Sequence, residues 1–194
     1  MLRVLHIYED GPEMEHAITE AMETIDIYPH FFPHLYKQGF KLKKYFSKPH
    51  GGVVLQDGVV ITFEKSKSNT RVARKTFARK KKGDMILHQI AAKERNGSAQ
   101  RVFNEFVKYC KTQHCENIIL SVRTSNEIAR RFYEKNGFEL VDSNPSLWNS
   151  KKDGPIGGSI YNLRLTAEKN IENINEHKIN LNFIQNVLRL FREI

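Results

Sequence analysis

The feature that most constrains the fold is residues 51–66, GGVVLQDGVVITFEKS, where two runs of β-branched residues flank Asp57 and Gly58. Valine, isoleucine and threonine favour β-strands, and Asp-Gly is a preferred pair for a two-residue turn between antiparallel strands. The stretch therefore predicts a β-hairpin. A chain that contains such a hairpin is expected to fold around a β-sheet.

Alternating strand and helix signals follow this hairpin. Residues 85–92, MILHQIAA, predict a buried strand, and a turn containing Gly97 leads from it into an amphipathic helix. Five apolar residues form a stripe along this helix that can face a sheet: Val102, Phe103, Phe106, Val107 and Cys110. The remaining signals are a strand at 117–122, a helix at 126–135 closed by Asn136-Gly137, a strand at 138–142 and a final strand at 160–165.

The two ends of the chain complete the order of elements. Residues 2–8 predict a short strand, residues 12–25 a helix, and residues 31–46 an irregular helix that is aromatic and basic. The tail from Thr166 predicts a helical extension. This order indicates a mixed sheet with helices on its faces, in the α/β to α+β class.

Length and composition narrow the class of protein. The 194 residues suit one compact domain over residues 1–165 with an extension over residues 166–194. The formal net charge of +9 favours an anionic partner, which can be nucleic acid, a phosphorylated cofactor or an acidic surface. No apolar run reaches the length of a membrane span, and the charges in MLRVLHIYEDG come too early for a secretory signal. We therefore expect a cytoplasmic protein with no membrane partner.

Several kinds of site find no support in the sequence. Cys110 and Cys115 are the two cysteines, and they lack the spacing of metal ligands, so we expect reduced thiols and no metal site. The chain has no Gly-rich loop followed by Lys-Ser/Thr and no three-glycine dinucleotide fingerprint. Classes of enzyme that depend on these motifs are therefore not indicated.

The turn after the strand at 85–92 can bind a ligand. Small residues at the start of a helix let free backbone N–H groups approach a pyrophosphate, and the helix dipole favours its negative charge. The turn consists of Arg95, Asn96, Gly97, Ser98 and Ala99. It can equally be an ordinary strand-to-helix turn that uses Gly97 for tightness.

Residues 125–140, SNEIARRFYEKNGFEL, resemble the second signature of the GNAT-type acyl-CoA transferases. In that signature an Asn opens a helix, an Ala and a Tyr follow on the same helix, and a Gly-Phe pair ends it. The matching residues are Asn126, Ala129, Tyr133, Gly137 and Phe138. The resemblance extends over residues 52–165 in the order of the elements, and it implies a mostly antiparallel central sheet flanked by helices.

The first signature of that family is a Gln/Arg-x-x-Gly-x-Gly/Ala turn on the pyrophosphate of the coenzyme. Gly97 and Ala99 match it, but Glu94 stands where the family has Gln or Arg. A carboxylate beside a pyrophosphate is unfavourable. Either Lys93 or Arg95 takes over the contact, or the coenzyme binds weakly.

The resemblance implies direct transfer of an acyl group, by default acetyl from acetyl-CoA, to an amine or hydroxyl without a metal. It implies that Asn126 hydrogen-bonds the pantetheine arm and that Tyr133 is the general acid for the leaving thiolate. His88 and Glu64 are candidates for the base, and a water chain is the alternative. The residues implied to bind the coenzyme are, besides Asn126 and Tyr133, Ile90, Ala91, Ala92, Arg95, Asn96, Gly97, Ser98 and Ala99.

Each of these side chains also has a structural interpretation. Tyr133 can be a core aromatic that packs on Phe132 and Phe138. Asn126 can be the N-cap of its helix, and it can fill both roles at once. His88 lies in an apolar strand, where a histidine is more often a core residue than a base.

The most basic stretch is residues 71–84, RVARKTFARKKKGD, with Phe77 among its cations. It can be a solvated hairpin arm, a phosphate contact for nucleic acid or a surface that recognises acidic proteins. The cations are Arg71, Arg74, Lys75, Arg79, Lys80, Lys81 and Lys82. Two further functions stay open: a DNA-base-modifying enzyme similar to the phage Mom-type proteins, and an inactive GNAT-fold module that binds nucleic acid.

The acceptor and the oligomeric state are not specified by any motif. A small amine, a protein terminus or lysine, an aminoacyl-tRNA and a nucleobase all remain compatible with the sequence. Apolar residues at helical spacing in the tail suit a helix that either forms a homodimer or folds back on its own domain: Ile179, Phe183, Val187, Leu190 and Phe191.

Overall fold

The computed structural model describes residues 2, 4–5, 16, 19–21, 23–24, 50–150 and 154–165 of the chain. A strand was predicted over residues 2–8, and Val4–Leu5 form the short strand β1. A helix was predicted over residues 12–25, and the described residues between 16 and 24 are helical. The predicted helix at 31–46 and the predicted extension at 166–194, with its dimer contact, lie outside the described residues. No helix in the described part is long and apolar enough to cross a membrane.

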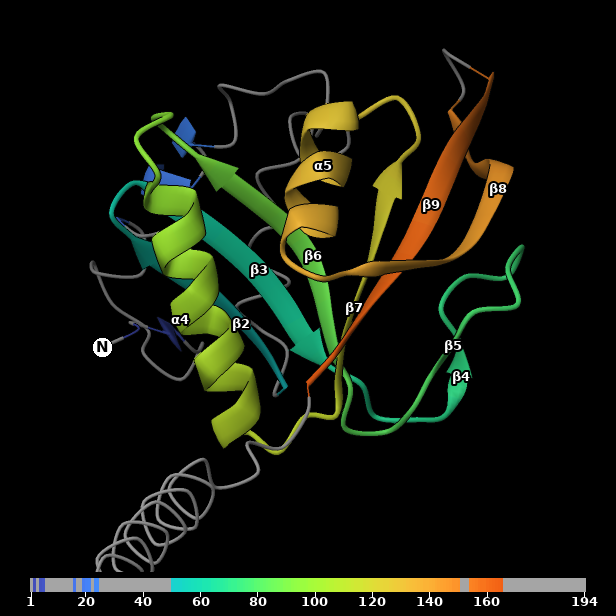
Figure 1. Cartoon of the computed structure of the whole chain (residues 1–194), viewed down its shortest axis with the longest axis horizontal. Helices are drawn as coiled ribbons and strands as arrows, with labels where there is room; N and C mark the ends of the chain where they lie inside the picture. The colour runs from blue at the N-terminus through green and yellow to red at the C-terminus, as the bar shows by residue number, and fades with distance from the viewer. Residues whose placement is uncertain are drawn as a thin grey trace, which may run out of the picture.

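The centre of the described fold is one large sheet. Its strands are β1 (Val4–Leu5), β2 (Gly51–Gln56), β3 (Val59–Lys65), β6 (Met85–Ala92), β7 (Asn117–Arg123), β8 (Glu139–Ser150) and β9 (Gly154–Arg164). They lie in the order β1-β2-β3-β6-β7-β9-β8 (Figure 1). All neighbours are antiparallel except β6 and β7, which are parallel. The predicted mixed, mostly antiparallel sheet is confirmed.

The hairpin predicted around Asp57 and Gly58 is β2 and β3. Gln56 pairs with Val59, which leaves the two-residue turn, and both turn residues have positive φ, 52° and 68°. This backbone matches the twist of antiparallel strands, and it is the reason why Asp-Gly is favoured there. The hairpin lies inside the sheet, between β1 and β6, and five of the six residues of β2 are buried.

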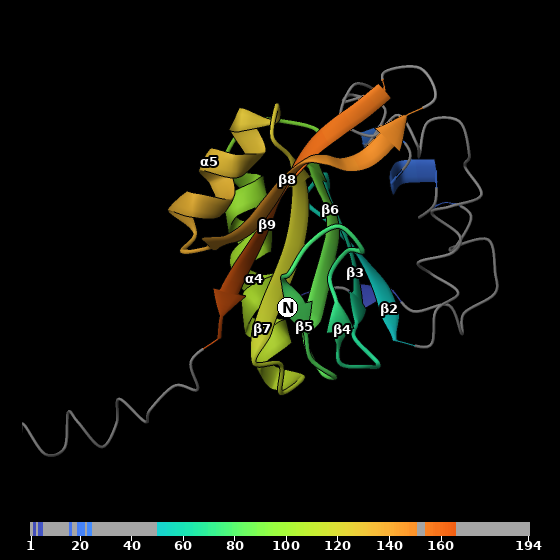
Figure 2. The ribbon, with the colours of Figure 1, turned by 90° about the vertical axis from the view of Figure 1, so that its right-hand side faces the viewer.

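Two helices cover one face of the sheet, and a short arm lies on the other face (Figure 2). The helices are α4 (Ser98–Thr112) and α5 (Glu127–Lys135). The arm contains β4 (Thr70–Arg71) and β5 (Arg79–Lys80). Val72 and Ala78 of the arm pack against Ile86, Ile119 and Ile160 of the sheet.

Aromatic rings fill the core between the helices and the sheet. The ring of Phe106 lies 5.1 Å from that of Phe63, and the ring of Phe103 lies 5.5 Å from that of Phe132. Burying each such side chain stabilises the fold by roughly 1.5–3 kcal/mol. The apolar stripe predicted on α4 is confirmed, since Phe103, Phe106, Val102 and Cys110 are buried and Val107 is partly buried.

The β8–β9 hairpin is longer than the sequence predicts. The predicted strands cover 138–142 and 160–165, whereas β8 runs to Ser150 and β9 begins at Gly154. The added residues are rich in Ser, Asn, Pro and Gly, which have low strand propensity. Pairing with the neighbouring strand overrides this propensity, and two shifts of register in β8 hide the alternation that would indicate a strand.

Candidate active site

β6 and β7 separate near the middle of the sheet. Three residue pairs join them, of which Leu87 with Leu120 is the last, although β6 continues to Ala92 and β7 to Arg123. Figure 1 shows the two strands diverging, with α5 drawn between their far ends. The edge of β6 beyond Leu87 is therefore not covered by β7, and its backbone can pair with an extended ligand.

A β-bulge explains the separation. Thr62 of β3 pairs with Gln89 and Phe63 pairs with Leu87, so His88 is an extra residue in β6. A bulge bends its strand and increases the local twist. It lies directly after the last residue that pairs with β7, so β6 turns away at that point.

The start of α4 presents free backbone donors beside this edge. Gly97 has φ of 84°, a left-handed conformation that turns the chain from β6 into the helix. The Ser98 N–H donates to Asn96 Oδ1 at 2.9 Å, and the first backbone bond of the helix runs from the Arg101 N–H to the Gly97 carbonyl. The N–H groups between them, at residues 99 and 100, have no acceptor among the described residues. The buried Ser98 Oγ also lacks a partner there.

The start of α5 is fixed by Asn126. Its Oδ1 accepts a hydrogen bond from the Ala129 N–H at 3.2 Å, so the N-cap interpretation is confirmed. At the other end of α5, the side-chain amide of Asn136 bonds that of Gln100 on α4. The beginning of α4 and the end of α5 are thus held together beside the separated strands.

Tyr133 is the buried residue of α5, and its side chain lies in the core. It is 6% exposed, and its ring lies 5.4 Å from Phe138 and 5.7 Å from Phe132. It belongs to the same apolar cluster as Leu87 and Leu120, where the strands separate. Burial raises the pKa of its phenol, so the hydroxyl stays protonated at neutral pH. No hydrogen bond to this hydroxyl occurs within the described part of the chain.

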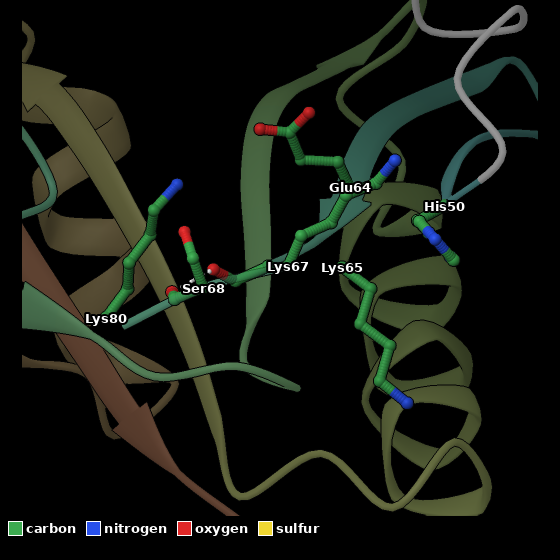
Figure 3. Close-up of a pocket in the computed structure, with 7 residues that line it drawn as sticks. His50, Glu64, Lys65, Lys67, Ser68 and Lys80 are labelled. Atoms are coloured by element: carbon green, nitrogen blue, oxygen red, sulfur yellow. Dashed lines mark hydrogen bonds between the residues drawn. The ribbon is translucent and has the colours of Figure 1, made fainter. Parts of the chain in front are cut away.

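His88 and Glu64 come together on the face opposite to α4. His88 Nε2 lies 3.5 Å from Glu64 Oε1, and both side chains are about three-quarters buried. Glu64 also lines a depression of about 320 Å³ to which Lys67, Ser68 and Lys80 contribute. Figure 3 shows the Glu64 carboxylate and the Lys65 ammonium directed to opposite sides, and Lys65 Nζ donates to the Gln113 carbonyl at 2.7 Å. The two predicted candidates for the base are therefore neighbours.

The cysteines take no part in this arrangement. Cys110 and Cys115 are buried and free, and burial raises the pKa of both thiols. Within the described residues, no group of three His, Cys, Asp or Glu side chains is placed to hold a metal ion. The predicted site residues that remain as candidates are Tyr133, His88 and Glu64, together with the backbone groups of β6 and α4.

Residues 21–138 match the sequence model of the Acetyltransferase (GNAT) family, more than half of the chain. The chain belongs to the GNAT family. The resemblance predicted from Asn126, Ala129, Tyr133, Gly137 and Phe138 is confirmed at the level of the family.

Solved GNAT structures share the fold at low sequence identity. A protein described as a probable acetyltransferase from Staphylococcus epidermidis is 16% identical, with 86% of this chain and 99% of that chain covered and a TM-score of 0.63. The ribosomal-protein-S18-alanine N-acetyltransferase of Escherichia coli is 15% identical, with 87% and 98% covered and a TM-score of 0.56. An acetyltransferase of the GNAT family from Streptococcus pneumoniae is 12% identical, with 85% and 100% covered and a TM-score of 0.54. No curated protein sequence matches the chain.

Acetyl-CoA is the donor of the GNAT family, and the described residues fit it. The uncovered edge of β6 and the free N–H groups at the start of α4 suit an extended arm and an anionic group respectively. Glu94 is exposed and accepts a hydrogen bond from Asn96 Nδ2 at 2.8 Å. Lys93 Nζ lies 3.5 Å from Glu23, whereas Arg95 has no ion-pair partner among the described residues. Of the two cations predicted to replace the family's Gln or Arg, Arg95 is the one available.

The structure adds three features to the predicted site. The bulge at His88 and the amide pair of Gln100 and Asn136 were not predicted, and Ser98 was expected in the coenzyme site but not as a buried hydroxyl without a partner among the described residues. The bulge depends on pairing with β3, and the amide pair joins residues that lie 36 positions apart. A Gly-Ser step at a helix start was the one signal in the sequence that pointed to the Ser98 hydroxyl.

Proposed function

We propose that the protein is an acyl-CoA-dependent N-acyltransferase that transfers acetyl directly to an amine. The observation that carries the proposal is the separation of β6 and β7 between the start of α4 and the buried Tyr133. An uncovered strand edge, free helix N–H groups and a protonated phenol are the groups that this reaction requires. They come from three segments of the chain: Tyr133 shares an apolar cluster with Leu87 and Leu120, and the Gln100–Asn136 pair joins the start of α4 to the end of α5.

The donor half of the site consists mainly of backbone. The edge of β6 at Ile90 and Ala91 orients an extended arm, and the N–H groups of Ala99 and Gln100 bind phosphate oxygens. Arg95 adds a positive charge at the same end. Acetyl-CoA, when bound, supplies an acyl group activated as a thioester. The Asn126 amide, whose oxygen caps α5, keeps its Nδ2 group as a donor to the arm.

Tyr133 is proposed as the general acid. Burial raises the pKa of the phenol, so Tyr133 Oη is protonated before the reaction begins. We propose that this proton passes to the sulfur of the leaving coenzyme as the carbon–sulfur bond breaks. The rings of Phe132 and Phe138 fix the orientation of the phenol and keep water away from it.

Glu64 and His88 are proposed as the groups that remove the proton from the acceptor amine. They are 3.5 Å apart, so one can take the proton while the other stabilises the charge that results. Glu64 pairs with Ile86, and His88 is the bulged residue just beyond the last pair between β6 and β7. Donor and acceptor would then meet from the two faces of the sheet.

The first experiment is calorimetric titration of the full chain with acetyl-CoA. We expect a dissociation constant in the micromolar range. A correctly folded protein that shows no binding would overturn the proposal. The titration needs no knowledge of the acceptor, so it tests the donor site alone.

Turnover is tested by thiol release with a panel of amines. Tyr133→Phe removes only the hydroxyl, and we expect kcat to fall about 100-fold or more while acetyl-CoA binding changes little. Tyr109→Phe is the matched control, because Tyr109 packs on Phe63 and Phe106 in the same core. Equal rates in the two variants would exclude the acid role of Tyr133.

His88→Gln and Glu64→Gln identify the base. The variant that lacks the base should lose about 100-fold in kcat and lose the acidic limb of the pH–rate profile. If neither variant loses the acidic limb, the base is a water chain.

The alternative of a DNA-base-modifying enzyme gains no support from the family match or from the solved structures.

A further inference from the structure

We infer that residues 66–84, the basic arm, form a binding surface for single-stranded nucleic acid. The segment has eight Lys and Arg residues and one acidic residue, Asp84. It lies on the face of the sheet opposite to α4 and α5 (Figure 2). The inference concerns a second binding site and does not depend on the proposed acyl transfer.

The charge of the basic arm is not neutralised within the described protein. Asp84 is buried, and its carboxylate accepts hydrogen bonds from the Lys81 N–H at 2.6 Å and from Asn117 Nδ2 at 2.9 Å. One arm cation has an acidic partner there, since Lys81 Nζ lies 3.5 Å from Glu116. The cations that are exposed and have no acidic partner among the described residues are Lys67, Arg71, Arg74, Lys75, Arg79 and Lys82. They remain available to phosphates.

An exposed aromatic ring lies among these cations. Phe77 is 84% exposed, the highest value among the exposed large hydrophobic side chains of the described residues. The guanidinium of Arg71 lies 5.7 Å from the centre of its ring. A base can stack on such a ring while neighbouring cations hold the backbone, which is how proteins bind single strands without reading their sequence.

The tip of the basic arm is fixed on β8. The Asp142 carboxylate accepts the N–H groups of Phe77 at 2.6 Å and Ala78 at 3.1 Å. These hydrogen bonds lower the pKa of Asp142, so the carboxylate is charged at neutral pH. Asn144 Nδ2 donates to the Lys75 carbonyl at 2.8 Å, and Lys75 Nζ donates to the Ser146 carbonyl at 2.6 Å. The backbone that carries Phe77 is therefore held in place before any partner binds.

The basic arm crosses the sheet between two hollows. Lys67 and Lys80 line the depression that also contains Glu64 (Figure 3). Arg79 and Lys81 line a second hollow of about 410 Å³ beside β7 and β9. Cations of the arm thus line both hollows, and the second hollow is also lined by Asp84 and Glu116. A strand that follows them would pass the acceptor side of the active site.

Nucleic acid accounts for these features better than an acidic protein does. Carboxylates on a partner protein would use the cations, but they would not use an exposed aromatic ring. Single strands fit better than duplexes, because the bases of a duplex are already stacked on each other. We therefore expect single strands to bind more tightly than a duplex of the same length.

The test is fluorescence anisotropy of the full chain with labelled single strands of about 12 nucleotides. The arm variant combines Arg74→Glu, Arg79→Glu and Lys82→Glu. The control variant has the same change in net charge on the helix face, through Lys108→Glu, Arg131→Glu and Lys135→Glu. An unchanged circular dichroism spectrum and an unchanged melting temperature establish that each variant is folded.

We expect the arm variant to bind at least tenfold more weakly and its salt dependence to fall by about two in log–log slope. The control variant should stay within about threefold of the natural sequence. Phe77→Ala should weaken binding by about fivefold or more with the slope unchanged, since it removes stacking and no charge.

Four outcomes would overturn the inference: no binding by the natural sequence, equal losses in arm and control variants, a duplex that binds as tightly as the single strand, or polyglutamate competing as well as the oligonucleotide. The last outcome would instead assign the basic arm to acidic proteins.

Discussion

On the helix face of the sheet, the contacts are between apolar side chains, as where Phe63 meets Phe106 at 5.1 Å. On the opposite face, the basic arm is held mainly by hydrogen bonds, as where Asp142 accepts the N–H groups of Phe77 and Ala78. Burial of apolar surface stabilises a fold strongly, whereas exposed polar contacts contribute little to its net stability. The proposed donor site is therefore part of the core, whereas the basic arm adds only a small apolar contact, through Val72 and Ala78, to the other face of the sheet.

The largest expected difference between the two faces is in phenylalanine truncation. Phe106 is completely buried, so Phe106→Ala should lower the free energy of unfolding by about 3–5 kcal/mol in urea denaturation. Phe77 is 84% exposed, so Phe77→Ala should lower it by less than about 0.5 kcal/mol. Similar losses would mean that the arm and the core form one cooperative unit.

The start of α4 provides the second test. Gly97 has φ of 84°, and a side chain there is strained, so Gly97→Ala should cost about 1–2 kcal/mol of stability. Acetyl-CoA should also bind more weakly, because the N–H groups of α4 would shift. Gly97→Asn should cost less, since asparagine adopts this conformation more readily. Equal losses by thermal denaturation would exclude backbone strain as the cause.

Asp142 provides a local test on the arm side. Hydrogen bonds, first that of the Phe77 N–H, lower the pKa of this carboxyl in the folded state. The contribution of Asp142 to the free energy of unfolding is therefore complete above the ordinary pKa of about 3.9, and it is lost as the pH falls through the lowered pKa. The NMR chemical shift of the Phe77 amide proton should titrate with a midpoint below the ordinary Asp pKa of about 3.9. A midpoint at the ordinary value would contradict the contact.

Asp142→Asn should loosen the tip of the basic arm and leave the core intact. We expect amide exchange at Phe77 and Ala78 to become about tenfold faster, while the melting temperature changes little. An unchanged exchange rate would show that Asn144 and Lys75 hold the tip without the carboxylate.

The smallest effect is expected at the base of the arm. Lys81 and Glu116 form an exposed ion pair with 3.5 Å between Nζ and Oε2. Glu116→Gln should change the free energy of unfolding by no more than roughly 0.5 kcal/mol, and less in high salt. A larger loss would show that this end of the arm is tied into the core.

The elements that build the helix-covered side of the sheet could be predicted from local sequence patterns. The apolar stripe of α4 repeats at helical spacing, and Asp57-Gly58 demands the turn that joins β2 and β3. Both predictions were correct because each signal lies within about one element. Tyr133 is a different case, since its proposed role came from the resemblance of residues 125–140 to a family and not from its pattern.

The other face could not be predicted in the same way. The bond between Asp142 and the Phe77 N–H joins residues 65 positions apart, and no local pattern specifies it. The extra residue at His88 becomes visible only when β6 is paired with β3. The extension of β8 to Ser150 likewise depends on its partner strand. Such features are set by tertiary contacts, which override local propensity.

The short ladder between β6 and β7 has a mechanical consequence. It divides the described sheet into two plates, β1-β2-β3-β6 and β7-β9-β8, joined edge to edge by three residue pairs. When the chain is pulled from both ends, we expect this seam to open before either plate unravels. A ligand bonded to both plates across the open end would then raise the rupture force, and single-molecule pulling would register its binding without any chemical turnover.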